Sequence, residues 1–298
     1  MKLATVRYRG KQAVGVLDLN RGCVWPLAEL LAGSEPSCHG DMVQVIRRYD
    51  RLRDRITLHR SSGIDLREVE FEAPIPRPAR NLFCVGKNYR DHAHEFANSG
   101  FDRSLSRPSD PTPDAPIVFT KLPESVIATG AAILYPDGIS DSLDYEGELA
   151  VVIGRQGRAI ARQRALEYVW GYTIINDITA RDWQARHQQW FLGKSFDTFC
   201  PMGPWVATAD ELDPGGLRIR TWVNGQLRQD ANTDDMIFGV PALIETISAG
   251  ITLYPGDIIA TGTPAGVGIG FVPPRYLRHG DEVAIEITGI GVLRNPVR

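Results

Sequence analysis

Two short apolar segments bounded by acidic residues constrain the fold of this chain most strongly. The first, residues 149–153, follows Glu146 and Glu148, and the second, residues 172–175, leads to Asp177. Both have the length and apolar content of buried strands. Alternate side chains of a strand share one face, so Glu146 and Glu148 are expected to point the same way. If the two strands are neighbours, three carboxylates converge.

Three carboxylates in one place repel each other unless a proton or a cation lies between them. The set contains no cysteine or histidine, and ligands that are all oxygen suit a hard cation such as Mg²⁺, Mn²⁺ or Ca²⁺. The alternative is that all three are strand-end acids that face water. The other motifs of the chain decide between these two interpretations.

Composition limits the class of protein. The 298 residues are 43% hydrophobic and 23% charged, which is ordinary for a globular chain with one large domain or a large domain and a small partner. A net charge of -3 gives no support for binding nucleic acid or an anionic membrane. No apolar run approaches the ~20 residues of a membrane-spanning helix, and the N-terminus shows no secretory signal. The four cysteines are scattered, which fits a reducing cytoplasm, so we expect a cytoplasmic protein.

The chain divides into two predicted domains. Residues 1–72 form a small N-terminal α/β unit with short strand-like runs and an amphipathic helix for which Asp41 is a plausible N-cap. Three prolines within residues 73–80 favour an extended linker. The larger domain is expected to comprise residues 73–298.

A candidate general base lies early in the larger domain. If residues 90–96 are helical, His92 and Glu95 lie three positions apart on one side of the helix. The carboxylate could orient the imidazole, fix its tautomer and raise its basicity, which a water-activating base requires. The alternative is an exposed helical turn with a surface ion pair.

A long loop and a lysine follow. Residues 98–116 carry four prolines and predict an irregular loop, which at this length is usually a lid, a binding loop or disordered. The strand-like run 117–120 ends at Lys121. Lys121 could bind a substrate carboxylate, although a lysine at a strand end is more often a surface residue.

Local patterns predict further elements. Residues 164–170 favour a short helix, and Thr179 is a fair N-cap for a helix that runs towards Trp190. Asn224-Gly225 favours the type I′ turn of a β-hairpin. The glycine-rich residues 261–270 lack the Gly-Lys-Ser/Thr ending of a P-loop. Such a loop can offer backbone N–H groups to a carboxylate or an oxyanion, or it can be a tight turn between strands.

Together these motifs resemble the fumarylacetoacetate hydrolase family. The matching segments, in the family's order, are GKNYRDHAHE, FTK, DYEGELAVVIG, GYTIINDITARDWQ, FLGKSFDTFCPMGPW and GDIIATGTPAGVG. They cover about residues 75–298; each is weak alone, but their order and spacing are specific. The resemblance implies a mixed, strand-rich α+β fold with a β-roll catalytic domain, normally dimeric.

The resemblance also implies roles for individual residues. The implied ligands of a divalent cation, Mg²⁺ or Mn²⁺ with Ca²⁺ possible, are Glu146, Glu148 and Asp177. The implied catalytic residues are His92, Glu95, Lys121 and Lys194. The implied substrate-binding residues are Gln184, Thr261, Gly262 and Thr263. Arg181 and Asp182 are expected to hold the metal-binding loop in place.

The leading functional hypothesis is metal-dependent hydrolysis of a C–C bond in an acylpyruvate or related 2,4-dioxo acid, through a metal-bound enolate. One alternative is a decarboxylase or isomerase of oxaloacetate-like or 2-hydroxymuconate-like compounds in aromatic catabolism. Another is a non-catalytic ligand-binding relative. Each predicts a small-molecule 2-oxo acid ligand and a homodimer, with no nucleic acid or membrane partner. The chain departs from the family's original hydrolase in its short N-terminal unit and in lacking a fourth metal carboxylate from earlier in the chain.

Overall fold

The computed structural model describes residues 1–56, 63–100 and 110–298. Strands dominate it and helices are few and short, which confirms the predicted mixed α+β class. The central part of the predicted loop at 98–116 falls on residues 101–109, outside the described residues.

A large mixed sheet organises the described part of the chain. Its strands, in spatial order, are β4 (Ile64–Asp65), β3 (Cys23–Pro26), β2 (Lys11–Asp18), β1 (Lys2–Tyr8), β13 (Cys200–Thr208), β11 (Val169–Asn176), β10 (Gly147–Ile153), β16 (Ile258–Ala260), β6 (Leu82–Gly86) and β7 (Ile117–Lys121), with β5 (Glu70–Phe71) beside β1 and β8 (Val126–Ile127) beside β13. The two predicted acidic strands, β10 and β11, are antiparallel neighbours at its centre.

A second sheet covers one face of the first. Its strands, in spatial order, are β15 (Gln226–Asn232), β14 (Arg218–Val223), β17 (Glu282–Ile287) and β18 (Gly291–Pro296), and a small separate pair is formed by β9 (Leu143–Asp144) and β12 (Thr179–Ala180). The β14–β15 hairpin turns at Asn224 and Gly225, both in the left-handed region with φ of 51° and 75°, as predicted.

Strand β10 is buried on both faces, which explains its uninterrupted apolar sequence. Leu149, Val151 and Ile153 pack into the core shared with the second sheet. Ala150 and Val152 face the opposite core, which the N-terminal unit completes. The alternation therefore directs Glu148 to the same side as Ala150.

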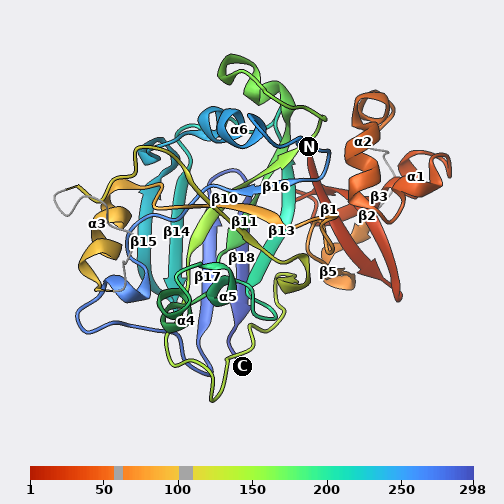
Figure 1. The fold of residues 1–298 in the computed structure, drawn as a ribbon. Coiled ribbons are helices and arrows are strands. Elements are labelled where there is room, and N and C mark those ends of the chain that lie inside the picture. Colours follow the sequence, from red (N-terminus) through yellow and green to blue (C-terminus); the bar gives the residue numbers. More distant parts are fainter. Residues whose placement is uncertain (57–62, 101–109) are drawn as a thin grey trace.

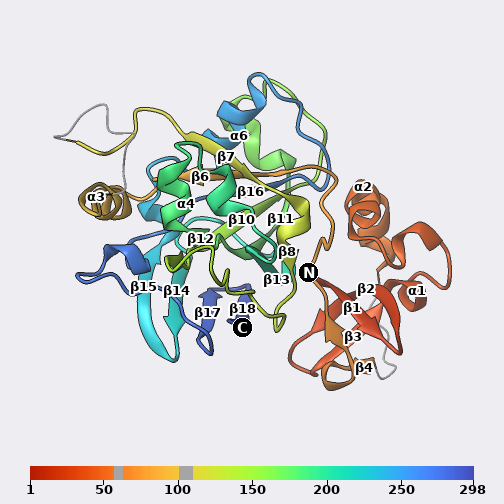
Figure 2. The same ribbon diagram turned by 60° about the horizontal axis from the view of Figure 1, so that its bottom comes forward.

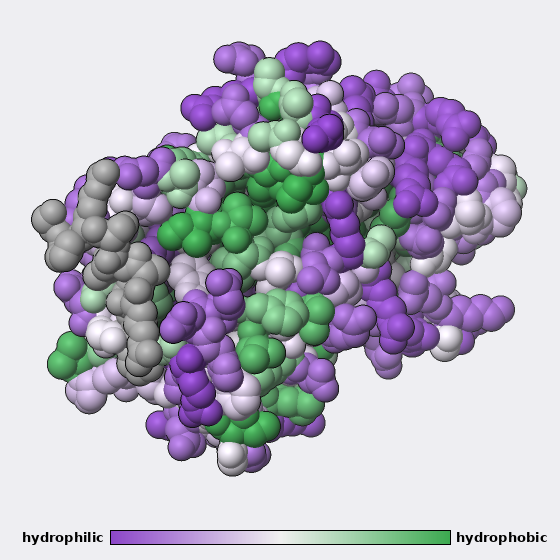
Figure 3. Space-filling view, in the orientation of Figure 1, coloured by the Kyte–Doolittle hydropathy of each residue, from purple (hydrophilic) through white to green (hydrophobic). Residues whose placement is uncertain are grey.

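The N-terminal unit continues the large sheet. Strand β1 pairs with β13, with Leu3 opposite Val206, so the sheet crosses the predicted boundary at residue 72. Asp41 accepts hydrogen bonds from the backbone N–H groups of Val43 and Gln44, which confirms it as an N-cap. Figures 1 and 2 show this unit, with α1 and α2, on one side of the molecule and α3 on the other. In Figure 3 the surface of the N-terminal unit, on the right, is mostly hydrophilic. Hydrophobic side chains gather near the centre of the molecule in this view.

The α-helices of the described chain are α1 (Leu27–Leu30), α2 (Met42–Leu52), α3 (Arg90–Asn98), α4 (Arg181–Arg186), α5 (Phe191–Lys194) and α6 (Val240–Ser248). The 3₁₀ turns are η1 (Pro36–Cys38), η2 (Arg53–Arg55), η3 (Leu66–Glu68), η4 (Pro123–Ser125), η5 (Arg162–Tyr168), η6 (Thr233–Asp235) and η7 (Gly268–Gly270). None of the described helices is long and apolar enough to cross a membrane.

Two local predictions are wrong. The helix predicted at 164–170 is the 3₁₀ turn η5, and Trp170 already belongs to β11, where its ring packs against the core. Thr179 does not cap α4, which begins at Arg181 after Ala180. The Thr179 hydroxyl instead donates to the carbonyl of Asp177, so it stabilises the turn that follows the third carboxylate.

Candidate active site

The three predicted carboxylates converge where the two central strands β10 and β11 meet at their ends. Gly147 at the start of β10 lies opposite Asn176 at the end of β11, so the residues just outside these strands meet. The backbone N–H of Asp177 donates to the carbonyl of Glu146 at 2.8 Å. One carboxylate oxygen from each of Glu146, Glu148 and Asp177 lies within 4.8 Å of the others. All three side chains are buried, so the interpretation as water-facing acids is wrong.

This cluster fits a divalent cation. Its donors are all oxygens, and their mutual spacing is compatible with oxygens bound at 2.0–2.6 Å from one central ion. Burial, reinforced by the negative charges of Asp177 and Glu146, raises the pKa of Glu148 well above its usual range. Repulsion of this kind is relieved when a cation lies among the carboxylates.

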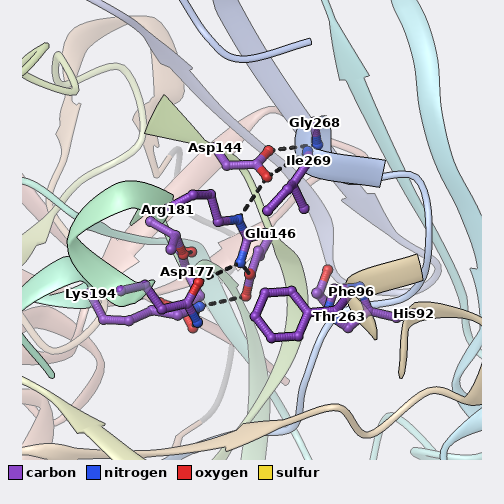
Figure 4. A network of polar contacts seen from close by, with 12 residues as sticks. His92, Phe96, Asp144, Glu146, Asp177, Arg181, Lys194, Thr263, Gly268 and Ile269 are labelled. Atoms are coloured by element: carbon purple, nitrogen blue, oxygen red, sulfur yellow. Dashed lines mark hydrogen bonds and ion pairs between the residues drawn. The ribbon is translucent and has the colours of Figure 1, made fainter. Parts of the chain in front are cut away.

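Three buried cationic side chains contact the cluster, and Figure 4 shows two of them, Lys194 and Arg181. The Lys194 ammonium lies 2.7 Å from Glu146 Oε2 and 2.7 Å from Asp177 Oδ2. Arg181 Nη1 lies 2.7 Å from Glu146 Oε1. Both oxygens of Glu146 therefore face a positive charge. Burial acts to raise the pKa of Glu146, but Lys194 and Arg181 outweigh it and lower that pKa.

Lys121 is buried, although it lies at the end of a strand. Its ammonium donates to Asp177 Oδ1 at 2.7 Å, to the carbonyl of Ile178 at 3.1 Å and to the carbonyl of Lys194. The side chain is fully buried, so Lys121 is not a surface residue. An ammonium has three N–H donors, and these acceptors use them all. Lys121 thus positions Asp177 and the end of α5.

His92 and Glu95 form a pair on α3 in which His92 is buried and Glu95 is partly buried. His92 Nδ1 lies 3.2 Å from Glu95 Oε2, as the helical spacing predicts, and His92 is only 5% exposed. The backbone N–H of Gly266 donates to both oxygens of Glu95, at 3.0 and 3.2 Å. The pair is therefore not a surface ion pair. A side chain at Gly270 would overlap the Glu95 carboxylate, which explains why that position needs a glycine.

The glycine-rich loop is attached to the acidic strand. The N–H of Gly262 donates to Glu148 Oε2 at 2.8 Å. The hydroxyls of Thr261 and Thr263 donate to the carbonyls of Leu149 and Gly147, at 2.8 and 3.0 Å. Of these loop residues, Thr263 lines the cavity beside the carboxylates. Contact of the loop with a substrate carboxylate stays a prediction.

One functional residue was missed from the sequence. Asp144 accepts from Arg181 Nε at 2.9 Å and from the N–H groups of Gly268 and Ile269, at 2.6 and 3.0 Å. It therefore orients the guanidinium that contacts Glu146. The sequence contained a sign of this role. Asp144 lies two residues before Glu146, and a third buried acid in so short a segment needs a positively charged or hydrogen-bonding partner. Asp182, in contrast, accepts hydrogen bonds from the Ser140 hydroxyl and the Trp183 backbone N–H, so its role in holding the metal-binding loop stays a prediction.

Replacement of Asp144 by asparagine is expected to weaken divalent-cation binding by about 10- to 100-fold, the range for residues that orient metal ligands. The change leaves the Arg181 charge opposed by Glu146 alone, which draws that carboxylate away from a cation. Isothermal titration with Mn²⁺ measures the affinity, and the exposed Asp141→Asn serves as the control. Equal affinities in the two variants would contradict this role.

The cavity beside the carboxylates is small. It has a volume of about 10 Å³, and its lining includes His92, Glu146, Arg181, Gln184, Lys194 and Thr263 together with Val85, Gly86, Lys87, Phe96, Phe119 and Trp190. Gln184 is fixed there by a 3.1 Å hydrogen bond from Arg181. A larger cavity of about 410 Å³ lies beside α2 and Trp170 and contains none of the three carboxylates. The chemistry is assigned to the smaller cavity, because the charged groups meet there.

Comparisons with known proteins identify the family of this chain. The family model described as fumarylacetoacetate (FAA) hydrolase C-terminal matches residues 81–298. Oxaloacetate tautomerase YisK of Bacillus subtilis (strain 168) is 51% identical over 233 residues, which are 78% of this chain and 74% of that protein.

Two solved structures are similar over the whole chain. A fumarylacetoacetate hydrolase (EaFAH) from psychrophilic Exiguobacterium antarcticum is 38% identical, with a TM-score of 0.81 over 100% of this chain and 99% of that one. Maleylpyruvate hydrolase from Sphingobium sp. SYK-6, in complex with manganese(II) and pyruvate, is 32% identical, with a TM-score of 0.79 over 100% and 98%. The chain therefore belongs to the fumarylacetoacetate hydrolase family.

Proposed function

We propose that this protein is a divalent-metal-dependent enzyme that interconverts the keto and enol forms of a short 2-oxo acid, with oxaloacetate as the leading candidate substrate. The observation that carries the proposal is the buried carboxylate cluster, whose member Glu146 lines the same cavity as His92. The 51% identity to an oxaloacetate tautomerase supports it and favours the isomerase alternative over C–C hydrolysis.

Glu146, Glu148 and Asp177 would hold the cation. Mg²⁺ and Mn²⁺ are the leading candidates, with Ca²⁺ a third, and the manganese in the maleylpyruvate hydrolase structure supports this choice. When bound, the cation supplies Lewis-acid polarisation of the 2-oxo group.

His92 would move the proton. In the keto-to-enol direction its ring accepts a proton from the carbon next to the 2-oxo group, the C–H electron pair becomes the C=C bond, and the C=O π pair moves onto the oxygen. The imidazolium then returns the proton to that oxygen, which gives the enol and restores the neutral ring. Glu95, itself held by Gly266, fixes the ring orientation and stabilises the imidazolium. Lys194 and Arg181 place positive charge beside the developing oxyanion, while Lys121 keeps Asp177 and Lys194 in position.

The second candidate is hydrolysis of an acylpyruvate or related 2,4-dioxo acid. The same His92–Glu95 pair is placed to take a proton from water, and the likeness to a maleylpyruvate hydrolase supports this alternative. Decarboxylation of oxaloacetate is a third outcome of the same enolate chemistry and needs no water attack. A non-catalytic relative would retain none of these activities.

Purified protein stripped of metal and reloaded with Mn²⁺ or Mg²⁺ is expected to accelerate the loss of the enol absorbance of oxaloacetate. Metal-stripped protein is the control and should show the uncatalysed rate. Pyruvate release from acetylpyruvate and from oxaloacetate, measured in the same samples, reports hydrolysis and decarboxylation. Unchanged enol decay in the loaded protein would reject the tautomerase, and release of pyruvate would select one of the alternatives.

The homodimer expected from the family resemblance is part of this proposal. Light scattering coupled to size exclusion should give a mass of about twice 33.0 kDa. A monomeric mass would reject the dimer without affecting the assignment of the site.

A further inference from the structure

Three aromatic side chains close one side of the candidate active site, and we call them the aromatic wall. Phe96 comes from α3, Phe119 from β7, and Trp190 from the connection between α4 and α5. The Trp190 ring meets Phe96 at 6.1 Å and Phe119 at 5.3 Å between centroids, both edge to face. All three line the cavity that contains Glu146 and His92. The wall therefore bounds the space where a substrate would extend.

The position of Trp190 is set by a glycine on the strand below it. A Cβ built on Gly86 would lie 2.7 Å from Cη2 of the indole and closer still to Cζ3. Any side chain at residue 86 would displace the ring. Gly86 thus lets the indole pack directly on the end of β6, which brings the wall close to the carboxylates.

The cavity is too small for a substrate with a long tail. A volume of about 10 Å³ corresponds to roughly one water molecule, so a bound 2-oxo acid must displace part of the lining. Glu146, Lys194 and Arg181 are fixed by buried ion pairs. Trp190 and Phe119 are partly exposed and uncharged, so a tail that extends beyond the 2-oxo acid head would have to displace them.

Two lysine ammonium groups lie against the rings of the aromatic wall. The Lys87 ammonium is 5.4 Å from the Phe96 ring centroid, and the Lys194 ammonium is 5.1 Å from that of Phe119. A short acid with a second carboxylate would place that group near these cations. A long alkyl or aryl tail would instead have to pass the indole.

We propose that Trp190 is a specificity-determining residue that limits how far a substrate extends beyond its 2-oxo acid head. It selects short acids, such as oxaloacetate and pyruvate, over 2-oxo acids with long acyl or alkyl tails. The inference rests on the proposed function, because it takes the 2-oxo acid head to be the group bound beside the carboxylates. A steric limit of this kind is worth about 10- to 200-fold in discrimination for one misfitting group.

The test compares two probes that share the 2-oxo acid head and differ in their tails, pyruvate and 2-oxooctanoate. Isothermal titration of each into the Mn²⁺-loaded protein gives the ratio of the two dissociation constants. Wild-type protein is expected to bind pyruvate at least tenfold more tightly than 2-oxooctanoate. Trp190→Ala should reduce that ratio by about tenfold or more, mainly through tighter binding of 2-oxooctanoate. Trp190→Phe, which keeps an aromatic ring against Phe96 and Phe119, should shift the ratio less, in the same direction.

Trp183→Phe is the matched control. Trp183 lies on the neighbouring helix α4, packs on Phe196, and donates its indole N–H to the carbonyl of Ile139, away from the cavity. The ratio of the two dissociation constants in Trp183→Phe should equal that of the wild type. If Trp190→Ala does not fold, as judged by circular dichroism, Trp190→Phe decides alone. An unchanged ratio in the folded variants overturns the specificity role, whereas failure of the loaded wild type to bind either probe overturns the proposed function as well.

Discussion

Replacement of Glu148 by glutamine is expected to lower the affinity for Mn²⁺ and Mg²⁺ by more than about 100-fold, because even residues that only orient metal ligands contribute 10- to 100-fold. Catalysis should fall in parallel. Glutamine keeps the size of the side chain, and its carbonyl oxygen can still accept the hydrogen bond from Gly262. The loss would therefore report the missing charge rather than a cavity.

The same substitution is expected to stabilise the metal-free protein at neutral and alkaline pH. Burial and the charges of Asp177 and Glu146 raise the pKa of Glu148 well above its ordinary value of 4.5. Between these two pKa values the folded state binds more protons than the unfolded state. The free energy of unfolding of the metal-free wild type therefore falls as the pH rises above about 4.5. Glutamine cannot ionise, so its variant should lose less stability over that range.

Thermal unfolding followed with and without Mn²⁺, at several pH values, measures both effects. Wild-type protein should gain stability on addition of metal, because the ion binds the folded state alone. Without metal, Glu148→Gln should unfold at a higher temperature than the wild type, and addition of Mn²⁺ should raise that temperature little. The exposed Glu124→Gln is the control and should behave as the wild type. An equal gain in stability for Glu148→Gln and wild type would discard the proposed ligand set.

Replacement of His92 by glutamine is expected to reduce kcat for oxaloacetate tautomerisation by about 100- to 10,000-fold, the usual contribution of a positioned general base. The affinity for Mn²⁺ should change little, because His92 is hydrogen-bonded to Glu95 and is not one of the three clustered carboxylates. Stopped-flow measurement of enol absorbance gives kcat and KM separately. A fall confined to kcat is the signature of a group that acts on the reacting proton.

His94→Gln is the matched control, because His94 belongs to the same helix but is exposed. It should retain wild-type kinetics. Retention of most activity in His92→Gln would show that the proton is moved by another group. Pyruvate release that persists in that variant would instead favour decarboxylation, which does not require water activation.

The carboxylate cluster was predictable because its geometry is local to two strands. Alternation places Glu146 and Glu148 on one side, and antiparallel pairing of β10 and β11 then brings Asp177 to them. The His92–Glu95 pair was predictable for a similar reason, since helical spacing alone sets it. The strand-rich fold class was also within reach of the sequence, through the order of its motifs.

Contacts between distant segments were not predictable in this way. Lys121 lies at the end of an unremarkable strand, and only the packing of β7 against α5 buries it beside Asp177. The aromatic wall joins Phe96, Phe119 and Trp190, which belong to separate elements. Thr179 carries a good capping side chain, yet its hydroxyl is used on the Asp177 carbonyl. Tertiary contacts set the first two of these features, whereas at Thr179 one local hydrogen bond replaces another.

The backbone loop that carries Gly262, Gly266 and Gly268 contacts both halves of the chemistry. Its backbone N–H groups donate to Glu148, to Glu95 and to Asp144, so the His92–Glu95 pair and the carboxylate cluster are both attached to one short piece of main chain. A change of loop length would displace both together. The aromatic wall receives none of these three backbone hydrogen bonds, so substitutions at Trp190 can change the cavity without moving the loop.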